Sequence, residues 1–331
     1  MHIDIYLVMG SAVVGLLVGL TGMGGGALMT PMLVLLFGVT PSAAIASDLM
    51  AAFFMKPAGV FIHWRRKTVN TSVVRYLCYG SVPAAFLGTY VMHLLGQSVV
   101  AEHRLQILLG SALIIGSIAI FYRSVFVETP ASGDEHVKVR PLPTVFIGIV
   151  GGFMVGLTSV GAGSLILVLL VMVYPTLSNK QLVGTDLAQS LPLTFSAALG
   201  TLLFGHVELG LTSSIIIGSV PMVIVGSLLS SRSNGYLLRR VITGVVLLSG
   251  LKYVGVPVDW LGIIGALEIV LITFLTIRHW RRTRDLVVEV SVPETVERVV
   301  TLLPTGLDGN LQLQKTALGE LPSRRDADVF E

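Results

Sequence analysis

Two aspartates, Asp48 and Asp186, lie inside long apolar stretches of this chain of 331 residues. Asp48 comes eight residues after Thr40, which precedes Pro41 in a pattern typical of a helix start, and Asp186 comes eight residues after Ser178. At about 1.5 Å per residue, each carboxyl group would lie roughly 12 Å inside its helix. A carboxyl group at that depth in a membrane is a functional hypothesis by default, and apolar surroundings favour its protonated form. Both aspartates are therefore candidates for proton coupling, and a structural role as buried backbone acceptors stays open.

Two glycine-rich breaks interrupt the apolar sequence, at residues 22–26 and 159–163. A membrane helix has to satisfy its own backbone groups, so such breaks are tolerated only where they face protein or a watery cavity. The half-helices that follow, beginning near Ala27 and Ser164, would direct their first amide groups at the membrane interior and offer a site for an anion. The alternative is that these glycines only let helices pack closely.

The candidate substrate-binding residues belong to these breaks and to the segments that carry the aspartates. They are Thr21, Gly22, Gly24, Gly25, Gly26, Ser47, Thr158, Ser159, Gly161, Gly163, Thr185 and Gln189. Lys56 could contact an anion directly, or its side chain could extend to the basic membrane boundary at Arg65. No lysine stands at the corresponding position of the second half, which has Thr194.

Eleven apolar segments would hold these candidate residues in place. Of all residues, 53% are hydrophobic and only 12% are charged, which is too few charges for an ordinary soluble domain. Two of the segments, 27–38 and 163–174, are about half as long as a membrane span. The remaining segments are 3–20, 42–64, 71–95, 104–122, 142–158, 179–204, 209–231, 237–254 and 259–277.

An internal repeat connects the two halves of this sequence. Residues 18–21 recur as 155–158, each copy followed by a glycine-rich break, and Ser47-Asp48-Leu49 matches Thr185-Asp186-Leu187. The tetrapeptide at 80–83 returns unchanged at 218–221, and all these pairs lie 137 or 138 residues apart. We therefore predict two five-segment repeats. Glu268, in segment eleven, has no counterpart and is expected to face another helix or an oligomer partner.

Basic residues in alternate short loops predict the orientation. Arg65 to Lys67 form one such group, and loops 96–103 and 255–258 contain no lysine or arginine. If the basic loops are cytoplasmic, the repeats are inverted, the N-terminus lies outside and the C-terminus inside. Nine and eleven membrane crossings are both allowed, since each broken pair could cross twice or re-enter. Inverted repeats with paired interruptions are typical of secondary transporters.

The predicted fold class is an all-α polytopic membrane protein of two inverted five-segment repeats with half-length helices, an extra C-terminal transmembrane helix and a tail. The first repeat covers 1–123, a cytoplasmic linker 124–141, the second repeat 142–255, the extra helix 256–278 and a polar cytoplasmic tail 279–331. Residues 278–331 contain 8 basic and 9 acidic residues in 54 positions, which is why the tail is expected to be solvated. Within the tail, 286–303 reads as a weak strand or an amphipathic stretch.

The sequence lacks the residues that several other classes of function require. The single cysteine, Cys78, has no partner for a disulfide or a thiolate metal site, and the histidines do not cluster. No Walker motif or paired nucleophile and base occurs, so we expect neither ATP hydrolysis nor an enzyme, and no cofactor or metal. A nucleic-acid partner is not expected either, because no dense Lys/Arg run with interleaved aromatics is present.

The glycine-rich segment at 19–26, with Pro31 and the Ser47-Asp48 pair, resembles the TauE/SafE family of sulfite and organosulfonate exporters, also called toluene sulfonate uptake permeases. The likeness covers about residues 5–255, with weaker echoes at 156–163 and 185–186. The second motif departs from the first, with Ser159 and Ala162 where the first has Gly22 and Gly25. This resemblance implies a carrier of small sulfur-containing anions in a bacterial or archaeal inner membrane, driven by an ion gradient.

The function expected from the sequence is therefore secondary active transport of a small anion such as sulfite or a sulfonate. Its partners would be that substrate and the lipid bilayer, and a homo-oligomer stays open. The alternative is a membrane scaffold or sensor that acts through the C-terminal tail.

Overall fold

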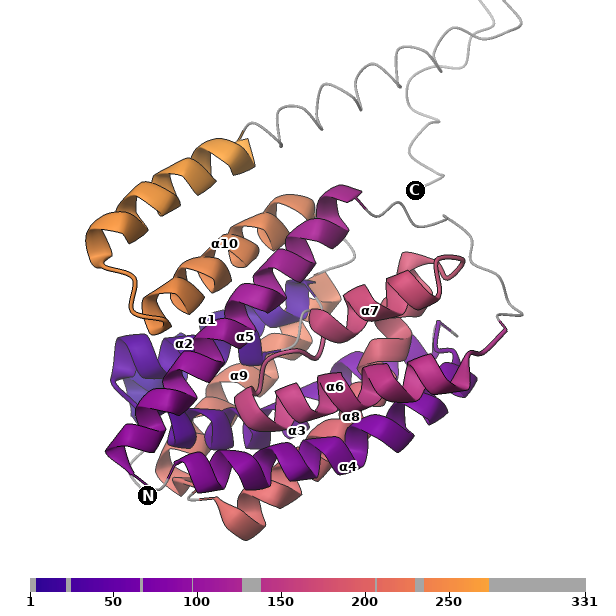
Figure 1. Cartoon of the computed structure of the whole chain (residues 1–331), viewed down its shortest axis with the longest axis horizontal. Coiled ribbons are helices and arrows are strands. Elements are labelled where there is room, and N and C mark those ends of the chain that lie inside the picture. Colours follow the sequence, from indigo (N-terminus) through magenta and orange to yellow (C-terminus); the bar gives the residue numbers. More distant parts are fainter. Residues whose placement is uncertain are drawn as a thin grey trace, which may run out of the picture. The chain divides into compact units, whose positions relative to one another are not determined.

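The computed structural model of the chain describes residues 4–21, 25–65, 68–96, 98–126, 138–205, 207–229 and 235–273. Every regular element within these ranges is a helix (Figure 1). They belong to a compact unit that extends from Met1 to Phe274. The predicted tail 279–331, with its stretch at 286–303, lies outside the described residues, as does most of the predicted linker.

Ten helices and one further helical stretch match the eleven predicted segments in order. The first half contains α1 (Ile5–Thr21), α2 (Gly26–Phe37), α3 (Pro41–Arg65), α4 (Thr71–Leu95) and α5 (Val99–Phe126). The second half contains α6 (Pro141–Thr158), α7 (Leu165–Val173), α8 (Asn179–Phe204), α9 (Leu209–Leu229) and α10 (Gly235–Tyr253). Residues 258–273 are also helical, beside α10. The all-α class is confirmed.

Two of the helices are too short to cross a membrane, as predicted. Helix α2 has 12 residues and α7 has 9. At about 1.5 Å per residue they are roughly 18 Å and 14 Å long, against a hydrocarbon core of about 30 Å. By contrast, five helical stretches are long and apolar enough to span: Pro41–Phe61, Val100–Tyr122, Pro141–Thr158, Lys180–Phe204 and Leu209–Leu229. The chain is therefore a multi-pass membrane protein.

Local sequence signals explain where several helices begin and end. The Asn70 side chain accepts a hydrogen bond from the Val73 amide at the start of α4. Ser178 and Gln181 form a capping box at the start of α8. Gly38 ends α2 with a φ of 65°, a left-handed conformation that glycine adopts at low cost.

Two helix pairs pack with their backbones in contact, and the pairs are equivalent in sequence. In the α1–α9 pair a Cβ on Gly15 would lie 2.5 Å from the Ser219 carbonyl oxygen. In the α4–α6 pair a Cβ on Gly152 would lie 2.4 Å from the Ser81 carbonyl oxygen. Gly152 follows Gly15 by 137 positions and Ser219 follows Ser81 by 138. Figure 1 shows α4 and α6 side by side. Small residues thus allow the same close approach twice.

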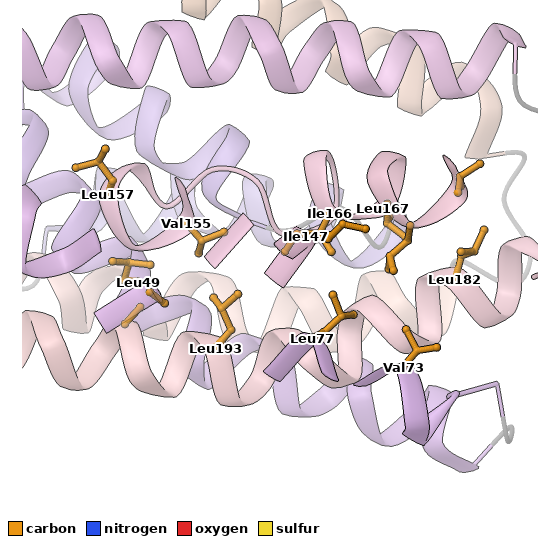
Figure 2. Packing of buried hydrophobic residues seen from close by; sticks show 14 of the residues in the cluster. Leu49, Val73, Leu77, Ile147, Val155, Leu157, Ile166, Leu167, Leu182 and Leu193 are labelled. Carbon is orange, nitrogen blue, oxygen red and sulfur yellow. The ribbon is translucent and has the colours of Figure 1, made fainter. Parts of the chain in front are cut away.

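Helices α3 and α8 cross at the centre and run antiparallel. Lys56 contacts Ser190, and Gly59 faces Leu187, so position numbers rise along one helix as they fall along the other. An apolar cluster packs around this crossing and reaches α4, α6 and α7 (Figure 2). Leu49 and Leu193, from α3 and α8, are fully buried in it. The apolar cluster therefore holds together the helices that carry the two aspartates.

Glu268 faces another helix. A Cβ on Gly244 of α10 would lie 2.6 Å from the Glu268 carboxylate, so that carboxylate lies against the α10 backbone. Of the two neighbours expected from the sequence, a helix of the same chain is the one observed.

Candidate functional site

The first glycine-rich break leads directly into the half-length helix α2. Gly22 and Gly24 lie outside the described residues, whereas Gly25 occupies the N-cap of α2 and Gly26 its first turn. A Cβ on Gly25 would lie 2.9 Å from the Met55 methyl group and 3.9 Å from Asp48 Oδ1. The start of α2 is therefore set directly against α3, at the level of its aspartate.

The second break reverses the chain between α6 and α7. Ser159 ends α6 with a φ of 60°, and is the one non-glycine residue with positive φ in the described ranges. Gly161 and Gly163 follow with φ values of 127° and 87°, which L side chains rarely adopt. Ser164 precedes α7, and its buried hydroxyl has no hydrogen-bond partner among the described residues. Glycines at 161 and 163 are thus a backbone requirement of this turn.

The two breaks meet. A Cβ on Gly26 would lie only 1.8 Å from the Ser159 carbonyl oxygen, so the chain can pass there only if residue 26 has no side chain. These positions are 133 residues apart in sequence. The structure therefore brings both predicted breaks to one place.

Asp48 lies at this junction and connects its parts. Its side chain is fully buried, and Oδ2 accepts hydrogen bonds from Thr30 Oγ1 at 2.9 Å and Ser159 Oγ at 2.7 Å. Thr30 belongs to α2 and Ser159 to the second break, so one carboxylate oxygen joins three segments. The other oxygen, Oδ1, is buried without a hydrogen-bond partner among the described residues. A buried acceptor of this kind is able to bind a proton or a ligand.

Asp186 occupies the equivalent position of α8 but has different neighbours. Its side chain is 2% exposed. Thr185, next to it, accepts a hydrogen bond from the Asn70 amide at 3.1 Å, in the connection between α3 and α4. The position equivalent to Ser159 is Gly22, which has no hydroxyl group, and the position equivalent to Thr30 falls in the apolar run of α7. The two aspartates are therefore not chemically equivalent.

Lys56 extends across the interface between α3 and α8. Its ammonium group donates to the Ser190 carbonyl oxygen at 3.4 Å, and its side chain is half-buried. It stands in α3 between Asp48 and the level at which Asp186 of α8 packs. Lys56 thus lies between the two carboxylates, and its ammonium group points at α8.

The four remaining candidates with hydroxyl or amide side chains fall into two groups. Thr21 and Thr158 donate to carbonyl oxygens one turn earlier in their own helices, those of Leu17 and Met154. Such bonds are typical of buried hydroxyls in helices. Ser47 Oγ and Gln189 Oε1, by contrast, are buried without hydrogen-bond partners among the described residues. Only this second group retains hydrogen-bonding capacity that no described residue uses.

The family of this chain follows from comparison with known proteins. The model of the family described as "Sulfite exporter TauE/SafE" matches residues 7–253. The chain is 38% identical over 249 residues to the "Probable membrane transporter protein YjnA" of Bacillus subtilis, covering 73% of this chain and 96% of that protein. The chain belongs to the TauE/SafE family.

A second relative supports this family assignment. The chain is 23% identical over 213 residues to the "Probable membrane transporter protein YdhB" of the same organism, with 64% of this chain and 84% of that protein covered. No solved structure matches the chain significantly. Relatives and family model agree that this TauE/SafE protein is a membrane transporter.

Three residues of the site were missed by sequence reasoning: Thr30, Ser81 and Ser190. Ser81 accepts a hydrogen bond from Gln189 Nε2 at 2.7 Å, and it belongs to the repeated tetrapeptide at 80–83, so the repeat was a usable signal. Thr30 is the polar residue nearest to Pro31 in an otherwise apolar run, which was a weaker signal. Ser190 contributes its backbone carbonyl, and residue type does not predict a backbone contact.

The junction contains no group of three or more metal-binding side chains, nor does any other part of the described ranges. The polar groups of the junction and of the adjoining α3–α8 interface are hydroxyls, one amide, two carboxylates and one ammonium group. Such a set is suited to hydrogen bonding and proton binding.

Proposed function

We propose that this protein is a secondary active transporter of a small sulfur-containing anion, such as sulfite or an organosulfonate, coupled to an ion gradient. The observation that carries the proposal is the junction of the two breaks, where Gly26 contacts Ser159 and Asp48 hydrogen-bonds to both sides. Substrate would bind at this junction. The family description, which names sulfite, supports the choice of substrate class.

An inverted-repeat architecture is part of the proposal, and the order of contacts supports it. Helix α2 is antiparallel to α1, since Gly10 lies near Phe37, and antiparallel to α3, since Thr30 bonds to Asp48. Helices α1 and α3 therefore run in the same direction. Helix α8 runs opposite to α3. Helix α4 is parallel to α8, as the contacts Gln189–Ser81 and Gly200–Thr89 indicate. The backbone contacts of the α4–α6 pair indicate that α6 is parallel to α4. Helix α6 then opposes its counterpart α1.

In this arrangement the two breaks would lie near mid-membrane, where the half-helices α2 and α7 begin. The first amide groups of a helix have no intrahelical acceptor and carry a partial positive charge. The amides at Gly25 and Gly26 would bind the oxyanion. The hydroxyl of Ser47, which has no hydrogen-bond partner among the described residues, would donate a further hydrogen bond, and a proton on Asp48 would prevent repulsion of the anion.

The proposed location is the plasma membrane, with the N-terminus outside and the C-terminus cytoplasmic. Arg65, at the end of α3, and Lys180, in the first turn of α8, then lie on the cytoplasmic side, in line with the bias of basic residues toward that side. Because α3 and α8 are antiparallel, the end of one lies beside the start of the other, so the assignment is self-consistent.

The test is transport by the full chain reconstituted into liposomes. Wild-type vesicles should accumulate labelled sulfite or methanesulfonate when a pH gradient is imposed, and Asp48→Asn should abolish accumulation while the protein remains folded. Exposed Lys180→Gln, on the neighbouring helix, is the matched control and should transport normally. Undiminished gradient-driven uptake by Asp48→Asn would refute the coupling role, and absence of flux with both anions in wild type would refute the substrate class.

A further inference from the structure

Among the described side chains of the α3–α8 interface, one cation, Lys56, stands between the levels of two carboxylates, and this charge makes the two halves unequal. Lys56 stands in α3, while the equivalent position in α8 is Thr194. Both side chains donate to the same acceptor, the Ser190 carbonyl oxygen, at 3.4 Å from Lys56 Nζ and 2.7 Å from Thr194 Oγ1. Thr194 makes this bond within α8, whereas Lys56 makes it from α3, so only one of the two equivalent residues is charged and reaches across the interface.

The register of this crossing places Lys56 nearer to Asp186 than to Asp48. Since Lys56 faces Ser190 and Gly59 faces Leu187, Asp186 lies level with residue 60 of α3. Lys56 is four residues from that level, which is about 6 Å along the helix axis, whereas Asp48 is eight residues away, about 12 Å in the opposite direction. Ser190 is also one helical turn from Asp186, so both lie on the same face of α8.

Charge and hydrogen bonding divide in the same way. Because Lys56 is closer along the helix axis to the level of Asp186 than to Asp48, its charge acts more strongly on Asp186. At Asp48, Oδ2 accepts hydrogen bonds from Ser159 and Thr30. Asp48 is thus stabilised by neutral donors, and Asp186 has a cation nearby.

The described elements around α3 and α8 contribute few other ionisable side chains. Helices α2, α6, α7 and α9 contain no ionisable side chain, although they pack around α3 and α8. On α4, Arg75, Tyr79 and Tyr90 are exposed, whereas Tyr76, Cys78 and His93 are half-buried. Glu102 of α5 hydrogen-bonds to Ser42 at the start of α3, and Arg65 and Lys180 are exposed. The other ionisable side chains of α5 and α10 that the structure describes are His103, Arg104, Tyr122, Arg240, Lys252 and Tyr253.

We infer that Lys56 is the counter-charge of Asp186, so that Asp48 alone binds the coupling proton and each transported anion is accompanied by one proton. This inference rests on the proposed function and adds a division of labour between the two carboxylates. Among these three groups, with Lys56 charged and both aspartates ionised, the net charge is one negative charge. A proton on Asp48 removes it, and the site then accepts a singly charged anion. Lys56 is a positioning residue in this scheme, since it acts through Asp186.

The experiment is a pair of double-mutant cycles on the full chain, with two independent measurements. One cycle consists of Lys56→Gln, Asp186→Asn and the double variant. The other cycle consists of Lys56→Gln, Asp48→Asn and their double variant. Thermal unfolding in detergent measures Tm without reference to any substrate. Uptake of methanesulfonate and of sulfite into liposomes, with and without a pH gradient, measures coupling. Lys56→Arg, which keeps the charge, and exposed Lys180→Gln are the controls.

We expect each single change at Lys56 and Asp186 to lower Tm, because removal of one charge leaves the other buried without that counter-charge. The double variant Lys56→Gln/Asp186→Asn should recover most of the lost Tm and pH-driven uptake, whereas Lys56→Gln alone should lose about tenfold or more in uptake, on the scale of coupling between neighbouring groups. The Lys56–Asp48 cycle should be close to additive in Tm. If the single variants fail to fold, recovery of folded protein in the double variant is the expected result.

Two results would overturn the inference. One is a double variant Lys56→Gln/Asp186→Asn no more stable than Lys56→Gln, and the other is a Tm coupling larger for Asp48 than for Asp186. Both can be observed even if wild type transports neither anion, so failure of the proposed substrate class remains distinguishable from failure of this charge pairing.

Discussion

Asp48 and Asp186 occupy equivalent positions in the two halves of the molecule, but their surroundings differ. Two hydroxyl groups donate to Asp48, from α2 and from the opposite half, whereas Lys56 lies on the side of Asp186. The packing surfaces of the two halves, by contrast, are closely alike: Gly15 meets Ser219 just as Gly152 meets Ser81. Helix packing requires small residues at fixed places in both halves, while the polar site allows one half to differ from the other.

The largest effect is expected where the two halves are most alike. Gly19→Val and Gly156→Val should each prevent folding or lower Tm strongly, because their added side chains would meet the carbonyl oxygens of Val223 and Ala85, 2.4 Å and 2.1 Å from a Cβ. Overpacking of this kind costs about 3 kcal/mol or more where backbone has to move. Thermal unfolding in detergent measures it.

Gly262→Ala is the control for this prediction, since no atom lies within 4 Å of its added Cβ. It should leave Tm unchanged. If one of the two valine variants folded with normal stability, the close equivalence of the α1–α9 and α4–α6 pairs would be wrong.

The next largest effect separates the two aspartates. Thr30→Val removes the α2 hydroxyl that donates to Asp48, and loss of a hydrogen bond to a charged group costs about 1.5–3 kcal/mol. Thr201→Val, a buried threonine that donates within its own helix, should cost less. Tm and pH-driven uptake should both fall for Thr30→Val. Equal effects of the two substitutions would show that the hydroxyl at position 30 has no special role at Asp48.

A smaller difference is expected between two equivalent serines. Ser81→Ala should cost about 1 kcal/mol or more, because it leaves the Gln189 side-chain amide without its partner at 2.7 Å. Ser219→Ala should be nearly neutral, since that hydroxyl donates to the Ile215 carbonyl of its own helix. Equilibrium unfolding of both variants compares the costs. A larger loss at Ser219 would contradict the asymmetry between the polar contacts of α8 and those of α3.

The smallest effect is expected from the tail. The family match ends at residue 253, and deletion of residues 283–331 should leave anion flux unchanged in liposomes. Flux lost on deletion while Tm is retained would favour the alternative in which the protein acts through its tail.

Hydropathy and the glycine and proline residues that interrupt apolar runs were sufficient to predict the helices, because both signals are local. The half-length segments 27–38 and 163–174 correspond to α2 and α7, with bounds shifted by one or two residues at each end. A run of apolar residues between glycine or proline breaks has few alternatives in a membrane, where each backbone group needs an internal partner. The largest shift is at α5, which extends beyond both ends of the predicted segment 104–122, to Val99 and Phe126.

The site was predicted less completely, since its contacts join residues that are distant in sequence. Asp48 was predicted from its depth, but its donor Thr30 was not, because a single threonine in an apolar run has no distinctive pattern. Thr21 and Thr158 were predicted to bind substrate, but their hydroxyls donate within their own helices. Which way a hydroxyl points depends on the neighbouring helix.

By itself, the sequence determined that the chain is an all-helical membrane protein, where its helices break, and that its two halves share landmarks at a constant spacing. Composition and local backbone requirements decide these features. Only the tertiary structure decided that Gly26 contacts Ser159, that Asp48 joins the two breaks, and that Lys56 lies on the side of Asp186. The reason is physical: these contacts depend on the register in which antiparallel helices cross, and that register is set by packing across the whole unit.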